Sequence, residues 1–273
     1  FDDRWHLMSN LNLDDFYMHP TNYEIDLKLP EGVYLNTDLE VSSIPSPPFM
    51  KYKITGKDRV DPEFNISIFN VFKTFKTDKL EIITNLNGTL LNDSIKKDVL
   101  NRQILFIEKY LGTYPHKKLF VNRISYDKNP IYGLNQLPKM FNPFTGVFEW
   151  DVKMFKVLTR KYLENTLLVD RREDIWLLDG IQTYLMMQYV ENYYPEIKAL
   201  GNISKIWGVR SYNIAKLDFN EKYPFVYQFA ARKNLDQALS TRADSLSNFN
   251  RKIVNKYKAG IGLRYLDEYL QGD

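Results

Sequence analysis

Cysteine is absent from the 273 residues, and histidine occurs only three times. The lack of cysteine excludes disulfide bonds, thiolate nucleophiles and cysteine-ligated metal sites. None of the three histidines, His6, His19 and His116, lies four residues from another, and we expect each on the surface or in a loop. A hydrolytic zinc site normally uses two or three histidines. The residues taken alone therefore indicate no catalytic constellation, and there is also no glycine-rich phosphate loop or G-x-S-x-G motif.

Long apolar runs and an excess of one charge are missing too. No run reaches the roughly 20 residues that a membrane-spanning helix needs, and no segment has the pattern of a signal peptide. The 37 basic residues nearly balance the 34 acidic ones, so a nucleic-acid partner is not expected. We interpret the lysine-rich stretch Lys73–Lys79 as a solvated edge. Because the sequence starts at Phe1 without methionine, we expect a fragment of a longer protein.

The first third of the chain has the pattern of β-structure. Apolar Tyr23, Ile25, Leu27 and Leu29 alternate with charged residues, as in a half-buried strand, and a turn at 30–32 follows. Further strands are predicted at Val33–Val41, Lys51–Thr55, Asn65–Phe72 and Leu80–Thr84, with the proline-rich stretch 44–48 separating the first two of them.

The remainder has mainly helical patterns. A helix capped by Asn92 or Asp93 is expected to end at Gly112, with Ile95, Val99, Ile104, Ile107 and Leu111 on one face. A strand is predicted at Leu119–Ser125, a loop at 127–146, and helices at Glu149–Thr166, Asp179–Tyr193 and Ser245–Leu270. Strands followed by helices predict an α+β fold with a boundary near residue 88.

One segment carries a family resemblance. The sequence Trp176-Leu177-Leu178-Asp179-Gly180-Ile181-Gln182-Thr183-Tyr184 resembles the W-L-x-E-G-x-x-x-Y segment of thermolysin-like zinc aminopeptidases (gluzincins) related to aminopeptidase N. In that family the Glu is the third zinc ligand and follows the first His of H-E-x-x-H by 23 residues. Lys156 lies 23 residues before Asp179, and the segment 156–165 is similar to the family's H-E-x-x-H-x-W-F-G-N in its aromatic residue and its final Asn165.

The resemblance implies that the zinc chemistry is lost. It places Lys156 and Arg160 at the two histidine positions, Val157 at the general base and Asp179 at the third ligand. Two cations repel a divalent ion, arginine cannot become a ligand, and valine accepts no proton. We therefore expect no bound metal, no cofactor and no catalytic residue. We also predict that Arg160 and Asp179 pair directly, with the guanidinium standing where the metal stood.

Three further segments support the resemblance, which spans roughly residues 20–270. The stretch 110–115 is similar to the family's F-G-x-Y-P. The stretch 132–138 takes the place of its substrate-binding strand, so Gly133 would be kept, while Asn135 or Gln136 would replace the Glu that holds the substrate amine. Tyr257 takes the place of the family's oxyanion-stabilising tyrosine.

The fold implied by the resemblance has two parts. Residues 1–87 would be a partial β-sheet domain, and residues 88–273 a thermolysin-like, mainly helical domain. We expect the family's C-terminal helical domain and much of its N-terminal domain to be absent from this chain. Many bacterial relatives are exported or membrane-associated, but no residue pattern here indicates a compartment.

Three functions are compatible with these observations. The first is a non-catalytic module that binds a peptide or protein partner in a residual cleft. The second is a hydrolase with altered chemistry, in which Tyr257, Asp179 and Glu164 or Glu173 supply acid–base groups. The third is a purely structural segment of a longer chain, which is also compatible with the first.

Overall fold

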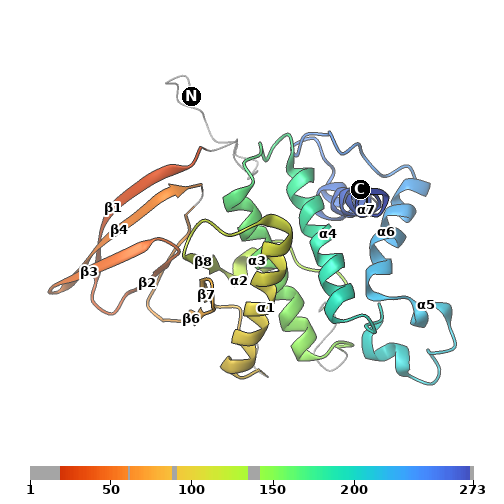
Figure 1. The fold of residues 1–273 in the computed structure, drawn as a ribbon, viewed down its shortest axis with the longest axis horizontal. Helices are drawn as coiled ribbons and strands as arrows, with labels where there is room; N and C mark the ends of the chain where they lie inside the picture. The colour runs from red at the N-terminus through yellow and green to blue at the C-terminus, as the bar shows by residue number, and fades with distance from the viewer. Residues whose placement is uncertain (1–18, 61, 88–90, 135–141, 271–273) are drawn as a thin grey trace. The chain divides into compact units, whose positions relative to one another are not determined.

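The computed structural model describes residues 19–60, 62–87, 91–134 and 142–270 (Figure 1). They divide into two compact units. The sheet-containing unit comprises residues 20–166 and 188–219, and the helical unit comprises residues 167–187 and 220 onwards. Most strands precede the helices and the fold is mixed α+β, as predicted. The domain boundary at 87/88 stays a prediction.

The N-terminal strands form an antiparallel sheet in the order β1-β4-β3, with β1 at Thr21–Pro30, β4 at Phe49–Arg59 and β3 at Glu40–Ser46. The alternation predicted for β1 is confirmed, because its apolar side chains are at least partly buried while the charged ones are exposed. Gly32 turns the chain after β1 with a φ of 85°, a conformation that glycine adopts without a steric penalty.

The expected strand Val33–Val41 is two strands. β2 (Tyr34–Thr37) pairs with β5 (Phe64–Ser67), and β3 begins at Glu40. Asp38 lies between the two strands. Its buried carboxylate binds Arg59 and the backbone N–H of Glu63. The prediction that the stretch 44–48 separates strands was wrong for residues 44–46, which belong to β3.

A second, smaller sheet has the order β6-β7-β8, with β6 at Lys73–Lys76, β7 at Glu81–Thr84 and β8 at Lys118–Val121. β6 pairs with β7 antiparallel, and β7 pairs with β8 parallel. The solvated edge expected at Lys73–Lys79 is thus largely the edge strand β6, whose Phe75 is nevertheless buried.

Local capping determines the helices of the sheet-containing unit. α1 (Asp93–Leu111) starts at Asn92, whose Oδ1 accepts the N–H of Ile95 at 2.8 Å, and stops at Gly112 with a φ of 79°. Val99, Ile104 and Ile107 are buried as expected, but Ile95 is exposed. Asn122 ends the expected strand 119–125 early because it caps α2 (Arg123–Lys128). The long helix α3 covers Gly146–Thr166, close to its prediction.

The core around α3 is rich in rings and contains one buried carboxylate. Phe155 stacks on Tyr189 with ring centroids 3.9 Å apart. The fully buried Asp151 accepts hydrogen bonds from Tyr189 at 2.8 Å and from Arg102, Gln103 and Tyr194. Burial and the Asp151 charge raise the pKa of Tyr189, so its hydroxyl remains a donor.

The helical unit contains the first part of α4 (Ile175–Tyr193), α6 (Lys222–Arg232) and α7 (Asn255–Leu270). A π-helical turn, η4 (Asn250–Val254), leads into α7. The short helices η2 (Gly201–Lys205), α5 (Asn213–Lys216) and η3 (Phe219–Glu221) lie between α4 and α6 in the chain.

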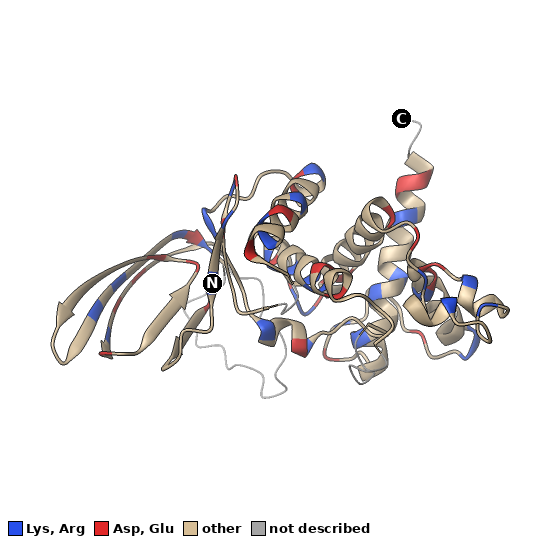
Figure 2. Cartoon of the chain, turned by 90° about the horizontal axis from the view of Figure 1, so that it is seen from below, with Lys and Arg blue, Asp and Glu red and all other residues tan. Residues whose placement is uncertain are grey.

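Basic and acidic residues are interspersed along most of the ribbon (Figure 2). This agrees with the even spread of charge expected from the sequence. Within the described ranges, no helix combines the length and the apolar character that crossing a bilayer requires.

Candidate functional site

α3 carries the positions that the resemblance assigns to two zinc ligands and the general base. Lys156 Nζ donates to the backbone oxygen of Pro130 at 3.2 Å, which holds the loop after α2. Arg160 Nε donates to Glu164 Oε1 at 2.6 Å, one turn along the same helix. Val157 is buried. The Arg160–Glu164 spacing of four residues is a pattern that the sequence displays directly.

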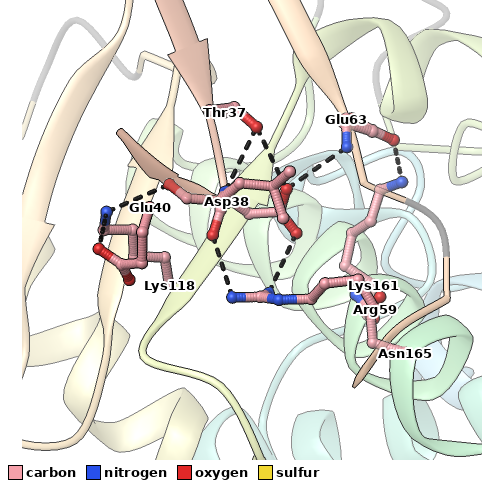
Figure 3. Close-up of polar contacts among 9 residues, drawn as sticks. Thr37, Asp38, Glu40, Arg59, Glu63, Lys118, Lys161 and Asn165 are labelled. Carbon is pink, nitrogen blue, oxygen red and sulfur yellow. Dashed lines mark hydrogen bonds and ion pairs between the residues drawn. The ribbon is translucent and has the colours of Figure 1, made fainter. Parts of the chain in front are cut away.

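The C-terminal end of α3 is joined to the strands by a polar network (Figure 3). Lys161 Nζ binds Glu63, and the N–H of Glu63 donates to Asp38 Oδ1 at 3.4 Å. Arg59 completes the network by donating to the backbone oxygen and Oδ2 of Asp38 at 3.3 and 3.5 Å. Burial raises the pKa of Asp38, against the opposing effect of Arg59. The network fixes the helix against the strands rather than offering groups to a substrate.

Two of the matched segments meet in this unit. Tyr162 of α3 donates its hydroxyl hydrogen to the backbone oxygen of Gly112, and its ring lies 4.9 Å from that of Tyr114. Asn165 donates to the Lys161 carbonyl at 2.9 Å and so closes the last turn of the helix. The aromatic residues of the two segments thus pack against each other.

The predicted substrate-amine strand is only partly described. Gly133 lies in a turn with a φ of 84°, a conformation that favours glycine. Asn135 and Gln136 lie outside the described residues. Their assignment stays a prediction.

Asp179 lies on α4 in the helical unit, inside the helix rather than at its cap, because α4 begins at Ile175. Asp179 Oδ1 is 3.8 Å from Lys256 Nζ, and their side chains are only 8% and 14% exposed. No sequence pattern selects Lys256 except its place directly before Tyr257. The structure therefore brings the assigned third-ligand position together with the residue directly before Tyr257.

Tyr257 itself is buried in a small core cluster with Met187, Tyr223 and Ile261. Its ring meets that of Tyr223 edge-on, with centroids 4.8 Å apart. Burial, with a further contribution from Tyr257, raises the pKa of Tyr223. The hydroxyl of Tyr223 therefore remains protonated at neutral pH.

The glycines of the two matched segments allow α4 and α7 to approach closely. A Cβ added to Gly180 would lie 2.8 Å from Ala259 Cβ, and one added to Gly260 would lie 2.6 Å from Thr183 Cγ2. Tyr184 adds a hydrogen bond of 2.8 Å to Asp267. The glycines of the two segments that carry the resemblance thus lie where two helices pack.

The residues assigned to the metal do not fit a zinc ion. Lys156 and Arg160 carry positive charge, and the Asp179 carboxylate already faces an ammonium group. Among the described residues, no three His, Cys, Asp or Glu side chains form a group that could hold a metal ion. Of the histidines, His6 lies outside the described residues, His19 is exposed, and His116 follows the turn at Pro115.

Comparisons with known proteins identify solved structures with a similar fold. No model of a known protein family matches the chain, and no curated protein matches it. Among solved structures, the chain is similar to an M1 zinc metallopeptidase from Deinococcus radiodurans, with a TM-score of 0.54 and 11% identity over 92% of this chain. A variant of a two-domain M1 zinc metallopeptidase bound to L-arginine gives the same TM-score and identity. This chain spans about half of those proteins, 53% in each case. At this identity the likeness concerns the fold alone, and the chain has a fold that resembles part of an M1 zinc metallopeptidase.

Proposed function

We propose that this chain is a non-catalytic, aminopeptidase-like module that binds a peptide or protein partner within a larger protein. The fold likeness to M1 metallopeptidases supports the aminopeptidase-like part of the proposal. The substitutions at the assigned catalytic positions support the non-catalytic part. Binding or scaffolding is the function that a peptidase fold can keep once its chemistry is lost.

The ion pair between Asp179 and Lys256 carries the proposal. A carboxylate that serves as a zinc ligand must face the ion, whose charge stabilises it. Here an ammonium group, largely shielded from water, supplies that positive charge. Lys256 thus supplies positive charge beside Asp179 without any Lewis acidity or activated water. The predicted pairing of Arg160 with Asp179 stays a prediction.

Metal content and turnover test the proposal together. The protein would be incubated with zinc, freed of unbound ion and assayed for metal and for cleavage of aminoacyl anilides and short peptides. We expect far less than one zinc per chain and no turnover above a zinc-free blank. One tightly bound zinc per chain, or measurable peptide cleavage, would overturn the proposal.

A variant with the family's residues restored tests the alignment itself. It combines changes at the four assigned positions: Lys156→His, Val157→Glu, Arg160→His and Asp179→Glu. If the assignments are right, this variant should gain stoichiometric zinc that the parent lacks. A folded variant without zinc would show that these residues do not converge.

Glu164 and Glu173, which the altered-hydrolase alternative would use, are both in ion pairs. Glu164 binds Arg160 and Lys161, at 2.6 and 3.5 Å. Glu173 forms an ion pair of 3.1 Å with Arg242, in which both side chains are about half exposed. Each carboxylate therefore has an evident structural role, and the alternative depends on the turnover assay.

A further inference from the structure

The segment from Ala199 to Leu217, named here the 199–217 loop, is closed at its base. Ala199 N–H donates to the Leu217 carbonyl at 2.8 Å. One residue further out, Lys198 and Asp218 form a bridge and an ion pair of 2.5 Å. The loop contains η2 and α5 and lies around the label α5 in Figure 1.

Hydrogen bonds hold the backbone of the loop. Gly201 has a φ of 50°, and the N–H of Asn202 donates to the Pro143 carbonyl at 2.6 Å, which fixes the loop near its base. Towards the tip, Arg210 N–H donates to Ile206 at 2.9 Å and Tyr212 N–H to Val209 at 3.0 Å. The tip therefore presents its side chains from consecutive hydrogen-bonded turns.

The tip exposes large apolar side chains that the core does not use. Trp207 is 79% exposed and Tyr212 67%, and Ile206 and Ile214 are also more than half exposed. Single exposed apolar residues are ordinary on protein surfaces, but a cluster on one short loop indicates an interaction surface.

The charges around this tip have a single sign. Lys205, Arg210 and Lys216 are exposed, and no acidic residue occurs between Glu196 and Asp218. Within the described chain, none of these three cations forms an ion pair with an acidic side chain. Elsewhere the two signs are interspersed (Figure 2), so this loop differs from the rest of the surface.

We infer that the 199–217 loop docks onto the headgroup region of an anionic lipid bilayer. Tryptophan and tyrosine favour that region because their rings are apolar with one polar group. Lysine and arginine are attracted to the negative surface potential, and the apolar side chains enter the boundary below the headgroups. Charge complementarity selects an anionic surface over a neutral one. The inference does not depend on the peptidase-related proposal.

Vesicle flotation tests this inference. The protein would be mixed with vesicles of phosphatidylcholine alone or of equimolar phosphatidylcholine and phosphatidylglycerol. We expect binding to the anionic vesicles only, weakening as salt is added. Neutralising Lys205, Arg210 and Lys216 together with glutamine should weaken binding on the order of a hundredfold, about fivefold per cation. Trp207→Ser should weaken it without changing the preference for anionic vesicles.

Matched controls separate this loop from general charge and exposed aromatic surface. Changing Lys51, Lys57 and Lys117 to glutamine removes the same charge from exposed positions in the same unit, and Tyr269→Ser removes an aromatic side chain that is 85% exposed. Both should bind like the parent. The inference fails if the parent does not bind anionic vesicles, or if the loop variants, with unchanged unfolding midpoints, bind as well as the controls.

Discussion

The contact between Asp179 and Lys256 joins two charged side chains that are both largely shielded from water. Asp179→Asn would leave the ammonium group of Lys256 without this carboxylate in a poorly solvated place. We expect the free energy of unfolding to fall by about 1–3 kcal/mol. Lys256→Met in the same background should recover part of the loss, because the buried charge is then gone too. Urea denaturation of the single and double variants measures this coupling.

An exposed pair supplies the comparison. Lys198 and Asp218 form an ion pair in which the side chains are 36% and 57% exposed, and Asp218→Asn should change stability much less than Asp179→Asn. Additive effects of Asp179→Asn and Lys256→Met would contradict a specific pair. A parallel cycle with Arg160→Met tests the pairing predicted from the resemblance.

His116 gives the chain a pH dependence. Burial, with the nearby Arg59 charge, lowers the pKa of this histidine to about 4, whereas an unfolded chain has a histidine pKa of about 6.5. Between these values the unfolded state binds more protons, so stability falls as the pH drops through this window. His116→Asn should lose less stability between pH 7 and pH 4.5 than the parent does, as measured by denaturant unfolding.

The variant His19→Asn is the matched control, because His19 is exposed near the start of the described chain. It should follow the parent at each pH. If His116→Asn also follows the parent, the burial of His116 does not contribute to acid sensitivity.

At the scale of elements, the predictions succeeded where the signal is local. Asn92 and Gly112 mark the ends of α1 because one side chain and one backbone conformation decide each end. The helix α6 was not predicted, and it contains a proline. Pro224 lies in the first turn of α6, however, where a missing N–H removes no helical hydrogen bond.

Long-range partners were beyond this kind of prediction. The pairing of Asp179 with Lys256 joins residues 77 positions apart in the sequence, and neither position has a periodic pattern that selects the other. The start of α4 was also missed, because the helix begins at Ile175 and Asp179, the predicted first residue, lies inside it.

The close approach of α4 and α7 gives a prediction about one helix with two glycines. Gly260→Ala would press a methyl group against Thr183, 2.6 Å from its Cγ2, and should destabilise the protein by about 1–3 kcal/mol. Gly262→Ala, on the same helix with no atom within 4 Å of the added Cβ, should stabilise it by roughly 0.5–1 kcal/mol. Thermal unfolding of both variants tests the contact, and equal effects would contradict it.

For the whole molecule, the sequence sufficed to predict a mixed α+β chain with strands first and a likeness to zinc aminopeptidases. The fold comparison agrees with that likeness at 11% identity. The two segments that carry the resemblance contain Gly180 and Gly260, which the contact between α4 and α7 requires. The division into two interleaved units could not be predicted, because it depends on which distant segments pack together.

Because each compact unit consists of separate chain segments, the parts of one unit are synthesised at different times. Residues 20–166 leave the ribosome before residues 188–219, which belong to the same compact unit. Until Tyr189 has emerged, Phe155 lacks its stacking partner and the buried Asp151 lacks the hydroxyl of that tyrosine. The nascent chain therefore carries an unfinished aromatic core while the first segment of the helical unit is being made. Such a nascent chain needs protection from aggregation during translation, although the finished fold buries this core.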